Sequence, residues 1–166
     1  MKTMLYHVAA AVALLGWMMV IFSFSAQPAV ESSQVSGGFS YRLVRAVNET
    51  FRLNLNEKEI KADAARIEYP VRKAAHMTEY AIMGLLCFAF YTTWNFRGKK
   101  CYIASFLTAV CYAGTDEFHQ IFVPGRSGRV SDVCVDAIGV LIGLLFLMLL
   151  IKIVRKHCEK EIHPIQ

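Results

Sequence analysis

The chain has 166 residues, of which 55% are hydrophobic and 19% are charged, whereas soluble domains usually carry about 25% charged residues. This composition indicates a small integral membrane protein of one domain. The net charge is +5, and because the basic residues form no nucleic-acid-binding stripe, we expect no nucleic-acid partner and interpret them as topology and lipid-headgroup signals. The five cysteines form no CxxC pair, so we expect small buried hydrophobes rather than disulfides or a zinc site.

The first predicted element is a membrane span at residues 5–24. This apolar run is nearly uncharged and is long enough to cross a hydrocarbon layer of about 30 Å. A cleaved signal peptide is the alternative, since Ser23 and Ser25 are small enough for a cleavage site. The run exceeds the usual hydrophobic region of a signal peptide, about 7–15 residues, which favours a retained span.

The segment 25–70 is predicted to be an extracellular loop that contains short amphipathic helices. Its first part, residues 25–38, is rich in small residues and is typical of a linker. Asn56 and Glu59 have the spacing of a capping box. Apolar residues recur at helical spacing in two stripes. These are Phe39, Leu43, Val47 and Phe51, and then Ile60, Ala64 and Ile67. We expect helices lying at the membrane surface, with an ordinary folded loop as the alternative.

Three further spans are predicted at residues 71–94, 101–123 and 132–151. Pro70 suits the first turn of the second span, and Pro124 ends the third span. The fold class is therefore all-α, an integral membrane bundle of four transmembrane helices with amphipathic interfacial helices between the first and second.

The distribution of basic residues predicts the orientation of this bundle. The short turn at 97–100 reads Arg-Gly-Lys-Lys, and a basic tail follows the last span. Placing both in the cytoplasm satisfies the positive-inside tendency, so both termini are expected to be cytoplasmic. With four spans, the segments 25–70 and 124–131 lie on the same face of the membrane, whatever the orientation.

Polar and ionisable residues gather at one end of the predicted spans, most of them between residues 116 and 136. On the second span Arg72, His76 and Glu79 fall at i, i+4 and i+7, which places them on one helical face. The polar ends of the last three spans all reach the same membrane surface, so we predict an outward-facing polar pocket. Its residues are Arg72, His76, Glu79, Asp116, Glu117, His119, Gln120, Arg126, Asp132 and Asp136.

The acidic residues of this pocket differ in their relation to the helix dipole. Glu79 and Asp132 are near predicted helix N-termini, where negative charge is favoured. Asp116 and Glu117 are near a C-terminus, where negative charge is disfavoured. We expect Arg126 to offset these two, with Arg129, a histidine, a bound cation or protonation as alternatives.

The pattern leaves the chemistry of the pocket open. An interhelical ion-pair network that fixes the bundle would use the same residues. A divalent metal at His76, Glu79, Asp116 and His119 is a second alternative, because two i, i+3 pairs of carboxylate and histidine are present. Acid–base chemistry would use His76 or His119 beside a carboxylate, with Arg126 holding a phosphate or carboxylate. No serine or cysteine nucleophile is evident.

A GxxxG motif lies on the fourth span, at Gly139 and Gly143. Small residues at this spacing let two helix backbones approach closely. We predict helix packing inside the bundle, with dimerisation as the alternative.

Four stretches give the chain a resemblance to a known family. They are FSFSAQ at 22–27, RKAAHMTEY at 72–80 followed by Gly84, DEFHQIFVPGR at 116–126, and SDVCVDAIGVLIG at 131–143. In these stretches the sequence resembles the VanZ-like family, which is named for a protein associated with teicoplanin resistance. The resemblance covers nearly the whole chain and implies a single VanZ-like membrane domain over residues 1–166.

The resemblance implies a multi-pass protein of the bacterial plasma membrane that lowers susceptibility to teicoplanin-type glycopeptides, and it implies no reaction. Three hypotheses follow. In the first, the pocket binds a membrane lipid or a lipid-linked, anionic cell-wall precursor and changes glycopeptide access. In the second, the chain is an intramembrane hydrolase or transferase acting on a phosphorylated lipid. In the third, it is a structural membrane partner for another protein, and no pocket forms.

Overall fold

The computed structural model describes residues 2–162, and this part of the chain is entirely helical apart from short connections. The all-α class is therefore confirmed. The described helices are α1 (Lys2–Ser25), α2 (Ala29–Phe51), α3 (Glu57–Thr93), α4 (Lys99–Gln120) and α5 (Val130–Ile162).

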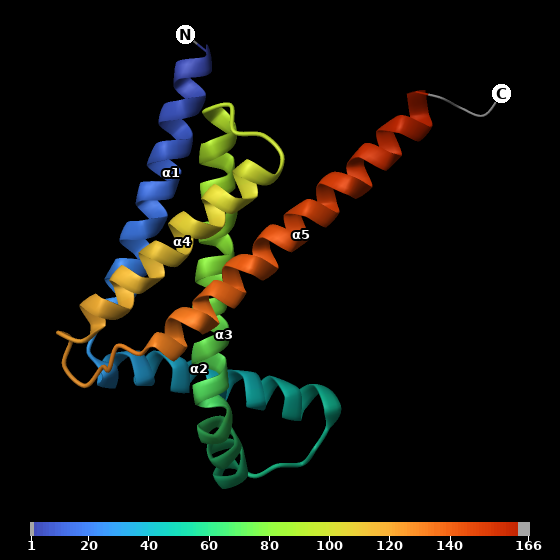
Figure 1. Ribbon diagram of the computed structural model, residues 1–166. Coiled ribbons are helices and arrows are strands. Elements are labelled where there is room, and N and C mark those ends of the chain that lie inside the picture. The colour runs from blue at the N-terminus through green and yellow to red at the C-terminus, as the bar shows by residue number, and fades with distance from the viewer. Residues whose placement is uncertain (1, 163–166) are drawn as a thin grey trace.

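The helices form a bundle with one helix lying across its end (Figure 1). α1, α4, α5 and the second half of α3 run between the two ends of the bundle, and α5 tilts away from it towards its C-terminus. α2 crosses the lower end in this view, close to the connection between α4 and α5. The start of α1, the end of α5 and the turn between α3 and α4 all lie at the opposite end.

Two helices are long and apolar enough to cross a membrane, α1 over Thr3–Ser25 and α5 over Val130–Glu159. Most of their side chains are exposed in the isolated chain. Two of the hydrogen bonds that join α1 to the bundle lie in the second half of this helix. The indole Nε1 of Trp17 donates to the carbonyl of Glu79 at 2.9 Å, and the hydroxyl of Tyr112 donates to the carbonyl of Met18 at 2.7 Å.

The linker predicted at residues 25–38 is wrong, because α2 already begins at Ala29 and continues through Gly37 and Gly38. Each glycine costs a helix about 1 kcal/mol relative to alanine. Packing against α3 offsets this cost. The hydroxyl of Ser36 donates to Glu68 on α3 at 3.0 Å. Thus one long helix replaces the first of the short helices expected from the apolar stripes.

The helix start predicted at Pro70 is also wrong, since Pro70 lies inside the single helix α3. Proline removes one backbone hydrogen bond, and side-chain contacts hold the helix on both sides of it. Glu68 is bound to α2, and Lys73 pairs with Asp132 at 2.6 Å. α3 begins with the predicted capping box at Asn56, which is confirmed.

α4 ends at Gln120, three residues before the predicted boundary at 123, and residues 121–129 form the connection to α5. Gly125 takes a positive φ of 75° in this connection. α5 begins at Val130 and extends well beyond the predicted boundary at 151.

The GxxxG motif packs α5 against α3, as predicted. A Cβ added at Gly143 would lie 2.6 Å from the carbonyl oxygen of Ala81, and one at Gly139 would collide with the carbonyl of Met77. Both contacts are with backbone atoms, which cannot rotate aside. The close approach of α3 and α5 therefore depends on these glycines.

Candidate functional site

The polar residues meet at the end of the bundle where α2 crosses it. Arg126 fastens the α4–α5 connection to the turn between α1 and α2. Its Nε donates to the carbonyl of Gln27 at 2.8 Å, and its Nη2 donates to the carbonyl of Phe24 at 2.9 Å. The backbone N–H of Ala29 donates to the carbonyl of Pro124 at 3.1 Å. These bonds place the predicted loops 25–70 and 124–131 at the same end of the bundle.

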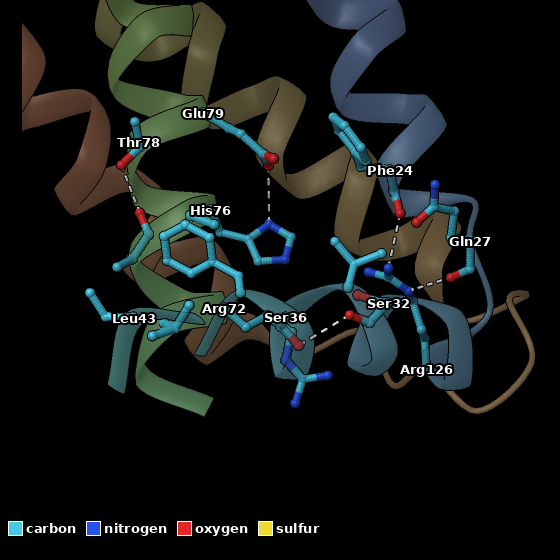
Figure 2. Close-up of a pocket in the computed structure, with 15 residues that line it drawn as sticks. Phe24, Gln27, Ser32, Ser36, Leu43, Arg72, His76, Thr78, Glu79 and Arg126 are labelled. Atoms are coloured by element: carbon cyan, nitrogen blue, oxygen red, sulfur yellow. Dashed lines mark hydrogen bonds and ion pairs between the residues drawn. The ribbon is translucent and has the colours of Figure 1, made fainter. Parts of the chain in front are cut away.

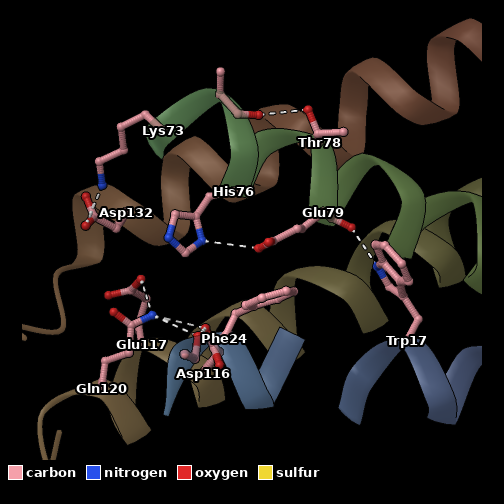
Figure 3. Close-up of polar contacts among 12 residues, drawn as sticks. Trp17, Phe24, Lys73, His76, Thr78, Glu79, Asp116, Glu117, Gln120 and Asp132 are labelled. Carbon is pink, nitrogen blue, oxygen red and sulfur yellow. Dashed lines mark hydrogen bonds and ion pairs between the residues drawn. The ribbon is translucent and has the colours of Figure 1, made fainter. Parts of the chain in front are cut away.

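The carboxylates of Asp116 and Glu117 are buried beneath this connection, with 2% and 6% of their surface exposed. Asp116 accepts a hydrogen bond from the hydroxyl of Ser25 at 2.6 Å. It accepts a second one from the amide of Gln120 at 3.1 Å (Figure 3). Glu117 accepts the same amide at 3.2 Å and the backbone N–H of Arg129 at 3.0 Å. The helix dipole disfavours negative charge at this C-terminal end of α4. Hydrogen bonds from neutral donors therefore stabilise the two carboxylates there.

The expected compensation by Arg126 takes an indirect form. Among the described residues Arg126 forms no ion pair, and its Nη1 reaches Oε1 of Gln120 at 3.5 Å. Gln120 thus lies between the guanidinium and the two buried carboxylates.

The middle of α3 contributes a group of titratable side chains to the site (Figure 3). Nδ1 of His76 lies 3.5 Å from Oε2 of Glu79. Lys73 pairs with Asp132 on α5 at 2.6 Å. Arg72 turns towards α2, where Nη1 donates to the hydroxyl of Ser33 at 3.3 Å. α3 therefore presents polar side chains to both α2 and α5.

A groove of about 590 Å³ lies between α2 and α3 (Figure 2) and is called here the α2–α3 groove. Its volume is within the range of about 300–1,000 Å³ that is usual for ligand sites. The apolar lining consists of Phe24, Val35, Phe39, Leu43, Val71, Ala74 and Ala75. The polar lining consists of Gln27, Ser32, Ser36, Arg72, His76, Thr78, Glu79 and Arg126.

A smaller cavity of about 220 Å³, called here the polar cavity, adjoins this groove. Its lining includes four cationic side chains and one carboxylate, namely Arg72, Lys73, Arg126, Arg129 and Asp132. Three residues line both spaces: Arg72, His76 and Arg126. The two spaces are therefore neighbouring compartments that meet at these side chains.

The charge of the polar cavity is only partly balanced by the protein. Lys73 pairs with Asp132, and Arg72 lies 3.9 Å from Glu68, but within residues 2–162 neither Arg126 nor Arg129 forms an ion pair. Burial lowers the pKa of the Arg126 guanidinium from its ordinary value, and the nearby carboxylate of Asp116 is the largest opposing influence. A half-buried guanidinium without a direct counter-ion is suited to binding an anion.

Comparison with known proteins assigns the sequence of this chain to a family. The VanZ/LLP1 family model matches residues 10–152, which is most of the chain. The chain belongs to the VanZ/LLP1 family. A search of curated proteins found no match to this chain, and neither did a search of solved structures. The predicted resemblance is thus confirmed at the level of the family.

Within this VanZ/LLP1 domain, the predicted pocket residues are found in three places. Those that line one or both compartments are Arg72, His76, Glu79, Gln120, Arg126 and Asp132. Those that are buried are Asp116, Glu117, Gln120 and Asp136. His119 lies apart, with its ring 4.6 Å from the ring of Phe22 on α1.

Sequence reasoning missed three residues of the site: Ser25, Gln27 and Lys73. The first two occur in the stretch FSFSAQ and the third in RKAAHMTEY, so the motifs that carry the family resemblance were an available signal. Their partners are 91, 99 and 59 positions away along the chain, and no local pattern reveals such pairs.

The structure also bears on the metal alternative. Among the described residues, no three His, Cys, Asp or Glu side chains are grouped so that they could hold one metal ion. His76 and Glu79 face one another, while His119 packs on Phe22. The four residues of the metal alternative are therefore not arranged around one common point.

Proposed function

We propose that this VanZ/LLP1 protein is a multi-pass protein of the bacterial plasma membrane that binds a lipid-linked, anionic molecule of the cell envelope. Binding of this molecule would change glycopeptide access and lower susceptibility to teicoplanin-type antibiotics, as the resemblance implies. The partner is a membrane lipid or a lipid-linked cell-wall precursor.

The proposed topology has four crossings, made by α1, the second half of α3, α4 and α5. Beyond the two long apolar helices, α4 supports it by exposing Ile103, Leu107 and Phe118, a stripe suited to lipid. The turn at 97–100 carries three basic residues and lies at the end opposite the site (Figure 1). By the positive-inside tendency that turn and both termini are cytoplasmic, so the site faces outwards.

The single observation that carries the anionic ligand is the excess of positive charge in the polar cavity. Four cationic side chains line it and only one carboxylate, Asp132, does so. That carboxylate is already paired with Lys73. Planar guanidinium groups bind phosphates and carboxylates with two parallel hydrogen bonds. Arg126 and Arg129 are therefore the residues expected to bind the anion.

The test removes these charges singly, as Arg126→Gln and Arg129→Gln, with Arg155→Gln as the control. Arg155 is an exposed arginine near the end of α5, remote from both compartments. Each variant is purified, and the anionic lipid bound to it is measured by mass spectrometry of the extract. Teicoplanin susceptibility is measured in bacteria that express it.

We expect both site variants to retain less anionic lipid and to restore susceptibility, while the control matches the wild type. Arg129→Gln is the more informative variant, because the Arg129 side chain forms none of the backbone hydrogen bonds that Arg126 forms. Equal lipid retention in Arg129→Gln and Arg155→Gln would contradict the proposal.

A hydrolase or transferase acting on a phosphorylated lipid is the second candidate. One observation favours it. His76 lines both compartments, and its Nδ1 lies 3.5 Å from the carboxylate of Glu79, the kind of neighbour that a general base uses. Release of inorganic phosphate from a lipid phosphate by the wild type, lost in His76→Gln, would establish this activity. If the protein binds the lipid phosphate and releases no inorganic phosphate, the lipid-binding function proposed first is the one that remains.

A further inference from the structure

The α2–α3 groove contains more apolar surface than binding of an anionic headgroup requires. Val35 and Phe39 line it from α2, and 67% and 58% of their surface is exposed. Leu43 continues the same face one turn further along the helix. Exposed apolar surface gathered in a groove marks a place where an apolar partner binds.

The opposite wall of the groove, on α3, includes three small side chains. Ala74, Ala75 and Thr78 of α3 face the bulky residues of α2 across the open space. All three are exposed. These small, exposed residues leave open space opposite the bulkier side chains of α2.

The groove also has a direction. Arg126 and Ser32 lie at one end of it, and Leu43 lies at the other (Figure 2). The polar cavity begins at the arginine end, where Arg72, His76 and Arg126 line both compartments. A molecule that fills both spaces therefore lies against the two arginines and the histidine that the compartments share.

We propose that the α2–α3 groove holds the hydrocarbon chain of a phosphate-bearing lipid, whose phosphate lies between Arg72 and Arg126 and whose polar remainder occupies the polar cavity. This inference rests on the proposed function and specifies its ligand. The chain leaves the surrounding bilayer and lies along α2, so the protein recognises the chain as well as the headgroup. Charge complementarity selects the phosphate, because paired guanidinium groups match its oxygens.

The first experiment compares two probes that share a phosphate and differ in their chain. Glycerol 3-phosphate and a long-chain lysophosphatidic acid are titrated by calorimetry into the full-length protein in one detergent. The test variant is Ala75→Phe, which fills the groove. The control is Ala89→Phe, at an exposed alanine of the same helix that lines neither compartment.

The wild type and Ala89→Phe are expected to bind the long-chain probe at least about tenfold more tightly than glycerol 3-phosphate, because the chain adds van der Waals contacts with the groove that glycerol 3-phosphate cannot make. Ala75→Phe is expected to lose this difference and to keep its affinity for glycerol 3-phosphate. Equal affinity of the wild type for the two probes would overturn the groove as a chain site and leave anion binding intact. Failure of both probes to bind would overturn the proposed function as well.

A second measurement locates the chain directly. A lysophosphatidic acid with a photoreactive diazirine at the end of its chain is irradiated with the wild-type protein, and the labelled peptides are sequenced. Labelling in the α2 segment that lines the groove, lost in Ala75→Phe, is the expected result. Labelling confined to the outer faces of α1 and α5 would identify an annular lipid only, and would overturn the inference.

Discussion

Substituting Gly143 by alanine tests whether the contact between α3 and α5 positions the site. The new Cβ would lie 2.6 Å from the carbonyl oxygen of Ala81. This is about 0.8 Å short of ordinary van der Waals contact. Because the obstacle is backbone, the two helices must separate. Forcing an extra carbon into a packed interface typically costs about 1–3 kcal/mol.

A gain in helix propensity opposes this cost, since alanine is favoured over glycine in a helix by about 1 kcal/mol. Gly16→Ala on α1 provides the matched control, because nothing lies within 4 Å of its added Cβ. The difference between the two variants isolates the clash, and we expect Gly143→Ala to be less stable than Gly16→Ala by about 1–3 kcal/mol.

The assay is unfolding of the purified protein in mixed detergent micelles of increasing denaturing strength, followed by circular dichroism. Separation of α3 from α5 would also strain the pair between Lys73 and Asp132, which joins the same two helices at 2.6 Å. Binding of anionic lipid should therefore fall in Gly143→Ala and not in Gly16→Ala. Equal stability of the two variants would refute the proposed helix contact.

Three further predictions concern the buried acids, the histidine and the topology. Ser25→Ala removes the hydroxyl that donates to the buried carboxylate of Asp116 at 2.6 Å, and it should lower the free energy of unfolding by about 1.5–3 kcal/mol. Ser23→Ala is the control, because Ser23 is exposed, and it is expected to change the free energy of unfolding by less than about 0.5 kcal/mol. The double variant His76→Leu with Glu79→Met should stay folded, because removing both members of a close polar pair leaves neither of them buried and unpaired. It should lose resistance in a member shown to confer it, and unchanged resistance would remove both residues from the site. An impermeant thiol reagent added outside cells should label a cysteine introduced at Ser127 and not one at Gly98, and the reverse pattern would invert the proposed orientation.

The helical class and the gathering of polar residues at one end could be predicted from the sequence. Both depend on local patterns. The apolar runs follow directly from composition, and the capping box at Asn56 needs only residues three positions apart. The GxxxG motif likewise predicts a close helix contact, whatever the partner. Such features are set by neighbouring residues and persist in any tertiary arrangement.

The boundaries of α2 and α3 could not be predicted in this way. Glycine and proline disfavour a helix locally, so Gly37, Gly38 and Pro70 suggested a linker and a helix start. In the folded chain, contacts between α2 and α3 outweigh those local costs, and both helices continue. Propensity is a weak guide wherever tertiary packing holds a helix on both sides of the disfavoured residue.

The site itself required the tertiary structure. The sequence predicted which polar residues gather, but it placed Arg126 against the buried acids, whereas Ser25 and Gln120 donate to Asp116. It contained no sign that Lys73 would pair with Asp132. The groove exists only because α2 folds back across α3 and presents its apolar face to small side chains there. Periodicity identifies a helix face, but the neighbour that this face meets is decided by the path of the whole chain.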